Sequence, residues 1–420
     1  MINNIPNLPE LNVGVVGHID HGKTTLLSKL TGKFTDTHSE ELKRGITIKL
    51  GYAETIIYHC GSNFSNKEIP GEKCVPLRYV SFIDSPGHEM LMATMLSGAA
   101  VIDAAILVIS ANEGIKPQTR EHFMALQAKK IKNIIIVQNK IDLVDKARAL
   151  QSHKEIKEFV KGTLAENSPI IPVSAQQEIN LNKIFEALAA IDIPKRDLES
   201  SPFFLIARSF DINRPGTEIK NLYGGVLGGI LKRGKLSVGQ EIEIKPGISM
   251  KKHNETIYKT VTTKILSLHK GNELVQEITP GASISIETSL DPFLTKADSL
   301  TGCVVSLVGK LPEIKHRIKL QTSLFNEVFG LGNRKIVDPL KTKELLMLSI
   351  NTTITVGTVE KISKNEIEFS LNIPVVALKG DNAGIAKNIE GHWRLIGWGI
   401  VSGVRPRDIC PRQNRKLVPY

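Results

Sequence analysis

The chain has 420 residues, and single hydrophobic cores rarely grow past roughly 250, so we expect two to four domains. Apolar residues make up 41%, enough for packed cores, yet no apolar run reaches the roughly 18 to 20 residues of a membrane span, which excludes a transmembrane helix. The net charge of +11, from 54 Lys and Arg against 43 Asp and Glu, fits a polyanionic partner such as nucleic acid.

The first segment contains a strand, a glycine-containing turn and a helix. Its opening residues, MINNIPNLPELN, lack the basic then apolar layout of a signal peptide, so we expect a cytoplasmic protein. Residues 11–17, LNVGVVG, are predicted as a buried strand, and residues 23–32, KTTLLSKLTG, as a helix closed by Gly32. Between them, GHIDHGKT fits the phosphate-loop pattern G-x-x-x-x-G-K-[ST] from Gly17 to Thr24, in the strand–turn–helix context that the pattern requires.

This loop predicts a site for a nucleoside triphosphate. Its glycines let backbone amides approach phosphate oxygens, and the helix that follows directs its positive N-terminus at the anion. We expect Lys23 to reach the β- and γ-phosphates and Thr24 to bind Mg²⁺. An ordinary glycine turn with a chance lysine is the alternative, and the strand and helix on either side argue against it. The loop residues expected to contact the nucleotide are Gly17, Asp20, His21, Gly22, Lys23, Thr24 and Thr25.

Two further segments are predicted to sense the terminal phosphate. KRGITI, residues 43–48, offers Thr47 as a second protein ligand of Mg²⁺, with an ordinary strand-entry threonine as the alternative. DSPGH ends the strand-like run YVSFI, and its Asp84 is expected to hold Mg²⁺ through water. The Gly87 amide is expected to sense the γ-phosphate, and His88 to orient the attacking water. A polar residue at a helix start is the alternative for His88.

The region that follows alternates strands and helices. The strand-like runs are AAILVIS at 104–110, NIIIVQNK at 133–140 and SPIIPVSA at 168–175, and the helical patterns are TREHFMALQAKK at 119–130 and INLNKIFEALAAI at 179–191. Strands that alternate with helices favour a mostly parallel sheet that is covered on both faces.

Two short strings at the ends of these strands predict which base is bound. In NKID the Asp142 carboxylate can accept two hydrogen bonds from guanine N1 and the 2-amino group, whereas adenine would leave a buried charge unpaired. Such a mismatch is worth about 10⁴-fold or more, so GTP and GDP are the expected ligands. Asn139 would support the loop and Lys140 would cover the ring, while an ordinary helix N-cap is the alternative for Asp142. The SAQ string adds a backbone amide for the guanine oxygen, from Ser174, Ala175 and Gln176.

These motifs together predict a slow GTP hydrolase. Water would attack in line, helped by Mg²⁺, with Lys23, Thr47 and His88 as the catalytic residues. The sequence offers no clear arginine finger, so we expect a partner to stimulate turnover. A kcat of the free protein above roughly 1 s⁻¹ would contradict this expectation.

Near residues 191–202, IDIPKRDLESSP, the helical periodicity vanishes. Short β runs separated by glycine turns follow, most clearly in GGVLGGILKRGKLSVGQEIEIKPG, and a second β segment begins near Leu311. We therefore expect an α/β P-loop GTPase domain with a mostly parallel sheet, followed by two β-barrel domains. The expected domain bounds are 1–198, 199–312 and 313–420, the last with a basic C-terminal tail.

Several longer strings resemble a known family. GHIDHGKTTL, RGITIKLGYAE, DSPGHEMLMATMLSGAAVIDAAILVI and QNKIDLV are similar to the translational GTPases. Within that family, HSEELKRGITIKLGYAE, RSFDINRPGTEIKNLYGGVLGG, SLDPFLTKADSLTG and HWRLIGWG resemble the γ subunits of archaeal and eukaryotic translation initiation factor 2. The resemblance covers nearly the whole chain and implies the same three-domain fold.

The resemblance implies a carrier of initiator methionyl-tRNA to the small ribosomal subunit, with GTP hydrolysis as the release switch and a GTPase-activating factor as its stimulator. It implies a heterotrimer, with the α subunit on the second domain and the β subunit on the first. It places the tRNA acceptor end between the nucleotide domain and the first barrel, where Tyr52 would stack on the terminal adenosine. A core aromatic is the alternative for Tyr52. The resemblance also brings Asp20 and the Gly45 carbonyl region near a second Mg²⁺.

One departure from the family pattern lies in an insert at about residues 56–79. The family often carries two zinc-binding C-x-x-C pairs there, but CGSNFSNKEIPGEKCVPL keeps only Cys60 and Cys74, with Asn63 and Leu77 at the second positions. Structural zinc takes four N or S ligands, so we expect no stoichiometric zinc. We expect the insert to survive as a loop held by apolar contacts alone. The four cysteines of the chain are too few and too scattered for a disulfide framework.

Two other functions stay open from the sequence. An elongator-type or selenocysteine-specific aminoacyl-tRNA carrier would share the nucleotide motifs and the barrels, and would differ in its selectivity for tRNA. A non-catalytic regulatory GTP-binding module would have no affinity for tRNA in its GTP form. The barrel strings favour the initiation factor, and the basic excess argues against a module without RNA.

Overall fold

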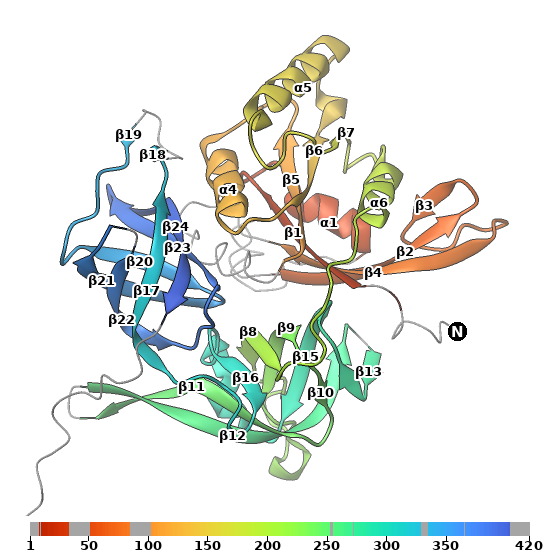
Figure 1. Ribbon diagram of the computed structural model, residues 1–420. Helices are drawn as coiled ribbons and strands as arrows, with labels where there is room; N and C mark the ends of the chain where they lie inside the picture. Colours follow the sequence, from red (N-terminus) through yellow and green to blue (C-terminus); the bar gives the residue numbers. More distant parts are fainter. Residues whose placement is uncertain are drawn as a thin grey trace, which may run out of the picture.

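The computed structural model describes residue 8 and residues 10–32, 51–84, 102–252, 255–271, 273–328, 335–364 and 366–403. Figure 1 shows an α/β domain at the top, followed along the chain by two β-barrels, one below it and one beside it. The predicted fold class is therefore confirmed. None of the helices in the described residues is both long and apolar enough to cross a membrane.

The α/β domain is built on a seven-stranded sheet in the order β3-β2-β4-β1-β5-β6-β7. The pairs β4–β1, β1–β5, β5–β6 and β6–β7 are parallel, and β2 pairs antiparallel with β3 and β4. The carboxyl ends of the parallel strands consequently meet at one edge of the sheet, where the phosphate loop leaves β1. The strands are β1 (Glu10–Gly17), β2 (Gly51–Cys60), β3 (Asn63–Ser65), β4 (Cys74–Asp84), β5 (Ala104–Ser110), β6 (Asn133–Asn139) and β7 (Ile170–Pro172).

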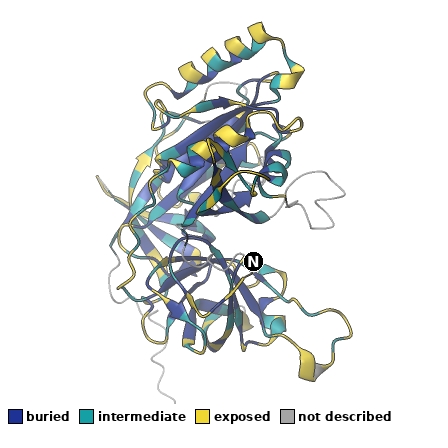
Figure 2. Cartoon of the chain, turned by 90° about the vertical axis from the view of Figure 1, so that its right-hand side faces the viewer, coloured by how far each residue is buried: buried dark blue, intermediate teal, exposed yellow. Residues whose placement is uncertain are grey.

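Helices cover both faces of this sheet, as the alternating pattern predicts. Neighbouring residues of β5 enter opposite cores, so Ile106 packs with α1 and α6 whereas Leu107 packs with α4 and α5. Helix α5 was not among the predicted helices. It buries only Ser152, Ile156 and Val160 and leaves its outer face exposed (Figure 2), so its apolar pattern in the sequence is weak. The helices are α1 (Lys23–Thr31), α4 (Pro117–Ala128), α5 (Lys146–Val160) and α6 (Leu181–Ala189), with a 3-10 turn η3 (Ile141–Leu143).

The first barrel closes through six strands in the ring β11-β16-β8-β9-β15-β12, because β12 pairs back to β11. Its strands alternate inward and outward residues, as in β15, where Ile284 and Ile286 are buried in the core and the residues between them are not. The elements are β8 (Phe203–Phe210), η4 (Ile219–Asn221), β9 (Val226–Arg233), β10 (Leu236–Ser237), β11 (Glu241–Lys252), β12 (Glu255–Lys270), β13 (Glu273–Val275), β14 (Glu277–Ile278), β15 (Ser283–Thr288), η5 (Pro292–Asp298) and β16 (Val304–Leu307).

The second barrel is a closed ring in the order β17-β22-β21-β20-β23-β24, with Phe369 and Leu348 in its core. The expected domain limits, after residues 198 and 312, fall in the connections between α6 and β8 and between β16 and β17, and they stay our proposal. The strands are β17 (Lys315–Leu324), β20 (Leu345–Ile350), β21 (Thr353–Ile362), β22 (Ile367–Val375), β23 (Asn382–Ile389) and β24 (His392–Gly403), with a ribbon of β18 (Glu327–Val328) and β19 (Lys335–Ile336).

The insert between β2 and β4 corrects one expectation. Cys60 lies opposite Cys74 in the antiparallel pairing of these strands, and a disulfide joins the two side chains. The prediction that apolar contacts alone hold the insert is therefore wrong, and the cysteines are less scattered in space than in sequence. The apolar contacts exist as well, since Phe64 of β3 packs against the domain core. The prediction on zinc stays a prediction.

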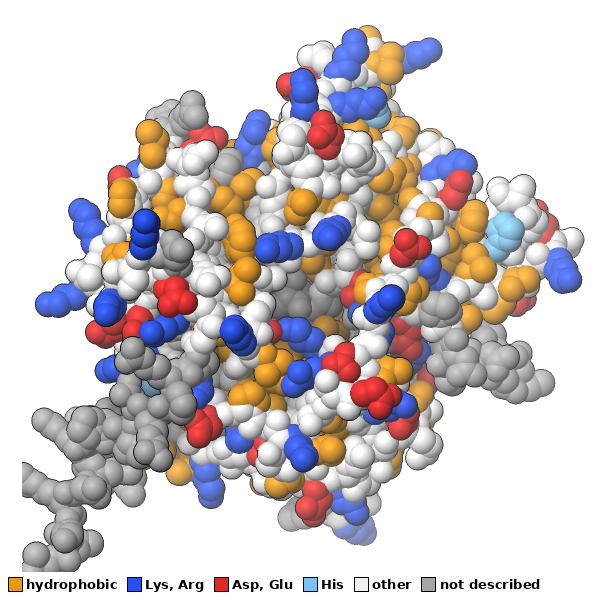
Figure 3. All heavy atoms as spheres, in the orientation of Figure 1, with side chains coloured by type: hydrophobic (Ala, Val, Ile, Leu, Met, Phe, Trp, Pro, Cys, Tyr) orange, Lys and Arg blue, Asp and Glu red, His pale blue; other side chains and the backbone are white. Residues whose placement is uncertain are grey.

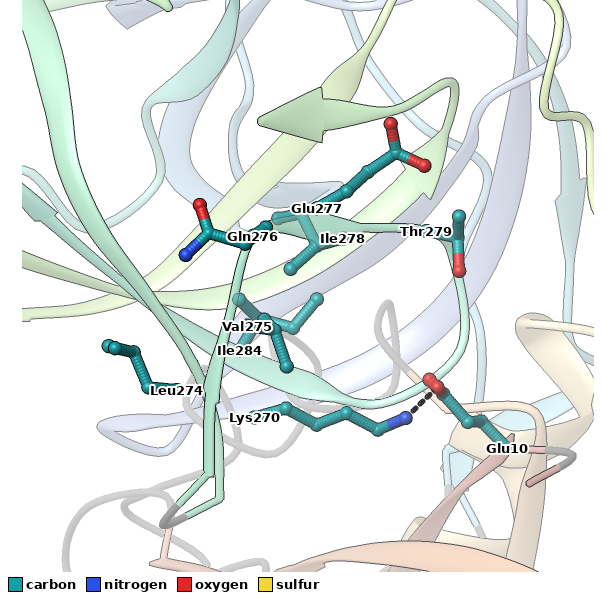
Figure 4. A pocket seen from close by; sticks show the side chains of 9 residues that line it. All are labelled: Glu10, Lys270, Leu274, Val275, Gln276, Glu277, Ile278, Thr279 and Ile284. Atoms are coloured by element: carbon teal, nitrogen blue, oxygen red, sulfur yellow. Dashed lines mark hydrogen bonds and ion pairs between the residues drawn. The ribbon is translucent and has the colours of Figure 1, made fainter. Parts of the chain in front are cut away.

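Two contact regions join the α/β domain to the barrels, and we call them the first and second seams. At the first seam, with the first barrel, Lys270 forms a buried ion pair with Glu10 beside a cavity of about 310 Å³ (Figure 4). At the second seam, with the second barrel, Arg394 of β24 pairs with Glu121 of α4 at 2.8 Å. Lys129, just after α4, donates a hydrogen bond there to a carbonyl oxygen of β20.

Candidate nucleotide-binding site

The phosphate loop has a backbone that only glycine accommodates at two positions. Gly17 and Gly22 have φ angles of 143° and 87°, which side-chain-bearing residues rarely adopt. A Cβ on Gly17 would lie 2.3 Å from the Val108 carbonyl oxygen, and one on Gly22 would lie 2.5 Å from Asn139 Nδ2. The glycines therefore let the loop approach β5 and β6 closely. Asp20 adopts φ of 61° between them, in the left-handed region where Asp is tolerated.

Lys23 and Thr24 begin α1 directly after this loop. The Lys23 side chain is nearly buried, and its ammonium donates to the His18 carbonyl oxygen at 2.8 Å, so the amine lies back over the loop. The Thr24 hydroxyl donates to Asp84 Oδ2 at 2.9 Å. A hydroxyl and a carboxylate from two different elements therefore meet at the edge of the sheet. Oxygen donors of this kind are what Mg²⁺ prefers, so the residues fit the expected ion.

Asn139 connects three of the predicted motifs. Its Nδ2 donates to the His21 carbonyl oxygen at 2.9 Å, and its Oδ1 accepts from the Ala175 amide at 3.0 Å. The side chain thus ties the phosphate loop to the SAQ string, which are more than a hundred residues apart in sequence. The His21 ring is itself buried against the Val108 carbonyl, and burial lowers its pKa to about 3, so it stays neutral.

The base-recognition strings lie in adjacent turns. Lys140 has φ of 61°, and its ammonium is 3.7 Å from Glu113. Asp142 lies exposed in η3, and Asp145 is the residue that caps α5, accepting from the Arg148 amide at 2.7 Å. The alternative interpretation of Asp142 as the N-cap of that helix therefore does not apply. Its carboxylate is accessible to a ligand, and guanine recognition stays a prediction.

Two residues of α4 contact the phosphate loop and had no predicted role. His122 Nδ1 accepts a hydrogen bond from the Gly17 amide at 3.0 Å, and Gln118 Oε1 accepts from the Ile19 amide at 3.4 Å. Burial lowers the pKa of His122 to about 3, so its ring stays neutral and can accept this bond. The sequence signal was their i, i+4 spacing in PQTREHF, which places both side chains on one helix face.

Other predicted site residues divide into those inside and outside the described part of the chain. Thr47, Gly45, Gly87 and His88 lie outside it. Tyr52 lies at the first seam, where its ring packs against the apolar side chains of the first barrel. Its hydroxyl is buried with no hydrogen-bond partner in the described residues, and burial raises its pKa. These contacts correspond to the core-aromatic alternative, and stacking on RNA stays a prediction.

Comparison with known families supports a guanine-nucleotide protein of translation. Residues 9–192 match the family described as the elongation factor Tu GTP binding domain. Residues 316–401 match the family described as initiation factor eIF2 gamma, C terminal. The two matches cover the α/β domain and the second barrel.

Individual relatives cover nearly the whole chain. Translation initiation factor 2 subunit gamma of Methanocaldococcus jannaschii is 50% identical over 403 residues, which is 94% of this chain and 98% of that protein. The subunits of the same name from Pyrococcus furiosus and Thermoplasma acidophilum are 51% and 50% identical, over 93% and 94% of this chain and 97% and 98% of those proteins.

Solved structures of lower identity share the fold. The bacterial selenocysteine-specific elongation factor EF-Sec superposes with a TM-score of 0.71 at 24% identity, and the match covers 94% of this chain and 58% of that one. The elongation factor SelB of Methanococcus maripaludis, in complex with a GTP analogue, superposes with a TM-score of 0.70 at 22% identity, covering 95% of this chain and 80% of that one.

Proposed function

Because this chain belongs to the family of translation initiation factor 2 gamma subunits and is a GTP-hydrolysing translational GTPase, we propose that it carries initiator methionyl-tRNA to the small ribosomal subunit. GTP hydrolysis to GDP and phosphate releases the cargo. The observation that carries this proposal is the convergence on Asn139, which holds the phosphate loop and the SAQ string together as one pocket. The identity of about half of all residues along the chain supports the same cargo as in its relatives.

In the proposed function the phosphate loop holds the triphosphate through its amides and through the Lys23 ammonium. Thr24 and Asp84, already in contact, would hold Mg²⁺, the first directly and the second through water, and Thr47 would be the further protein ligand. The ion supplies positive charge for the phosphate oxygens when it is bound. A second ion near Asp20 and Gly45 is the weaker part of the proposal.

Selectivity for guanine rests on the Asp142 carboxylate, which is exposed in η3 and forms no hydrogen bond or ion pair with the described residues. Lys140 covers the base, and the amides of the SAQ string receive the guanine oxygen. For hydrolysis, His88 orients the attacking water and Gly87 senses the γ-phosphate. Because the chain offers no clear arginine finger, a GTPase-activating factor stimulates the reaction.

The proposed partners follow from the same family membership. The α subunit binds the first barrel and the β subunit binds the α/β domain, which gives a heterotrimer. The acceptor end of the tRNA lies between the α/β domain and the first barrel. Tyr52 lies in that region, although its partly buried ring would have to leave its contacts with the barrel before it could stack on a base.

The proposal is tested by filter binding of initiator and elongator methionyl-tRNA to the protein loaded with GTP or GDP. The assay is done with the α and β subunits present and absent. We expect preferential binding of the charged initiator in the GTP state. Equal binding of both tRNAs would indicate an elongator-type carrier, and preference for selenocysteinyl-tRNA would indicate the selenocysteine-specific one. If the GTP-loaded protein bound no tRNA, the result would favour a regulatory GTP-binding module.

A further inference from the structure

A second cavity, which we call the seam pocket, opens at the edge of the second seam. It has a volume of about 320 Å³. Its walls come from two domains, the end of α4 and its following loop on one side and the second barrel on the other. Figure 3 shows Lys and Arg side chains beside hydrophobic ones along this boundary. The lining residues are Gln127, Ala128, Lys130, Lys132, Leu164, Phe325 and Trp398.

The charges in the seam pocket are not balanced. Lys130 and Lys132 are exposed, and neither forms an ion pair with any described residue, while no acidic residue lines the cavity. The cavity at the first seam differs, because its buried Lys270 is already paired with Glu10 (Figure 4). Two unpaired cations over an acid-free cavity favour an anionic ligand.

The aromatic side chains that line the seam pocket place a second requirement on its ligand. The Lys130 ammonium lies 4.7 Å from the centre of the Trp398 ring, and Phe325 lines the same cavity. Indole is the best aromatic partner for a cation and also stacks with flat π systems such as nucleobases. Cations next to an accessible indole match a ligand that joins a flat ring to a phosphate. An acidic peptide would satisfy the cations and leave the indole without a flat partner.

The backbone holds Lys130 in this place. Helix α4 ends with the Ile131 amide bonded to the Leu126 carbonyl at 3.0 Å and the Lys130 amide bonded to the Gln127 carbonyl at 2.9 Å. This pair of bonds is the Schellman motif, in which the left-handed residue is usually glycine. Lys130 occupies that position with φ of 57°, and this backbone sets the direction in which its side chain leaves the chain at the edge of the pocket.

One buried amide is also unsatisfied at this site. The Gln127 Nε2 atom is buried and has no hydrogen-bond partner in the described residues. Rotation of the terminal amide would present this donor to an acceptor that enters the cavity. The carbonyl and ring nitrogen atoms of nucleobases are such acceptors.

We propose that the seam pocket binds single-stranded RNA, with one base against Trp398 and the flanking phosphates on Lys130 and Lys132. The Gln127 amide donates to an edge of the base. Because the cations belong to the α/β domain and the aromatic rings to the second barrel, bound RNA bridges the second seam. This site is separate from the nucleotide pocket and does not depend on which tRNA the protein carries.

The test uses Trp398 as its own reporter. The chain has two tryptophans, so Trp393→Phe leaves Trp398 as the single tryptophan, whose fluorescence is excited selectively over that of the six tyrosines. The full-length variant, saturated with GDP, is titrated with a five-nucleotide oligo(A) RNA. We expect saturable quenching of Trp398 fluorescence. In the same background, Lys130→Gly with Lys132→Gln should weaken binding about tenfold or more, and make the slope of log K against log salt shallower by about 1.4, which is two phosphate contacts.

The glycine substitution suits the left-handed backbone at residue 130, so the variant should fold. A matched control removes two exposed lysines from α5, Lys154→Gln with Lys157→Gln, and should leave the RNA affinity within twofold. Several results would overturn the proposal: no quenching of Trp398, an equal loss of affinity in the control variant, equal affinity for inorganic tripolyphosphate, or equal affinity for an acidic peptide. The last result would assign the pocket to a protein partner.

Discussion

At the first seam the buried ammonium of Lys270 meets a carboxylate, that of Glu10, whereas at the second seam the buried ammonium of Lys129 is hydrogen-bonded to the carbonyl oxygen of Ser349. Burial, together with the nearby ammonium of Lys232, lowers the pKa of Lys129 to about 8, while Asp381 opposes both effects. The first seam is thus balanced in charge, and the second carries a surplus of positive charge. A surplus of buried charge makes an interface sensitive to pH and to anions.

The two seams also differ in their relation to the nucleotide site. Glu10 begins β1, at the end of the strand away from the phosphate loop. Helix α4, in contrast, contacts the phosphate loop through Gln118 and His122 and contacts the second barrel through Glu121. In α4 the contacts with the second barrel and with the phosphate loop come from adjacent residues, Glu121 and His122, whereas at the first seam Glu10 and the loop residue Gly17 lie at opposite ends of β1. Four changes would break or sharpen this comparison.

The largest effect is expected from Glu121→Gln. This change removes the carboxylate charge that faces the buried guanidinium of Arg394, and breaking a buried ion pair from one side typically costs about 3–5 kcal/mol. We expect a lower thermal unfolding midpoint and faster hydrogen exchange in α4 and β24. Glu186→Gln, which breaks the exposed pair with Lys183, should change stability by less than about 1 kcal/mol. If Glu121→Gln lowered the free energy of unfolding no more than Glu186→Gln does, the buried ion pair would not distinguish the second seam from the first.

The surplus charge should appear as a dependence on alkaline pH. The pKa of Lys129 is about 8 in the folded chain against 10.5 for an ordinary lysine, so the unfolded state binds more protons between these values. Stability therefore rises as pH increases from 8 to 10.5, by up to about 3 kcal/mol. The check is to measure the free energy of unfolding of the chain and of Lys129→Met across this pH range, where the variant should show no such rise. If both proteins gained stability equally with pH, the lowered pKa of Lys129 would be contradicted.

The contact between α4 and the phosphate loop should appear at acidic pH. The pKa of His122 is about 3 in the folded chain and 6.5 ordinarily, so the unfolded state binds more protons in that window. His122 alone should lower stability by about 1.4 kcal/mol for each pH unit below 6.5, or about 2 kcal/mol at pH 5. The pKa of the buried His21 ring is also about 3, so this residue contributes a similar slope. His122→Gln keeps an acceptor for Gly17 and should reduce the combined slope by about half, whereas His59→Gln, at an exposed position, should leave it unchanged.

The smallest effect is expected at the first seam. Glu10→Gln keeps a polar atom near Lys270, and the adjacent cavity admits water to the ammonium, so we expect a loss of about 1–2 kcal/mol. Burial also raises the pKa of Glu10 in spite of the Lys270 ammonium. The cost of burying the ionised carboxylate therefore offsets part of its attraction to that ammonium. The same thermal and hydrogen-exchange measurements apply. A loss as large as that of Glu121→Gln would show that the two seams are energetically alike.

The local parts of the structure were predictable from the sequence. Residues 11–17 and 23–32 form the expected strand and helix, and Gly32 ends the helix in a left-handed conformation. These features depend on neighbours within a few positions, so apolar periodicity and glycine placement are enough to predict them. The parallel sheet and the barrels follow because such elements have few ways to bury their apolar faces.

The contacts between distant segments were not predictable in the same way. Arg394 and Glu121 are 273 residues apart, and neither has a local pattern that marks its partner. The only local signal for His122 was its i, i+4 spacing from Gln118, and its bond to Gly17 requires the packing of α4 on β1. Cys60 and Cys74 became a pair only when β2 and β4 folded into register. Pairing of this kind is set by tertiary packing, which cannot be read from the local pattern of a single sequence.

The covalent link between β2 and β4 has a mechanical consequence. A shift of these antiparallel strands by one residue would turn Ala53 and Ile57 out of the core, because side chains alternate between the faces of a sheet. With Cys60 and Cys74 joined, such sliding would require a bond to break. The far end of β2 carries Tyr52, which is wedged against the first barrel. The cross-link thus fixes the register of β2 against β4, and Tyr52 can leave the first barrel only if the two strands move together.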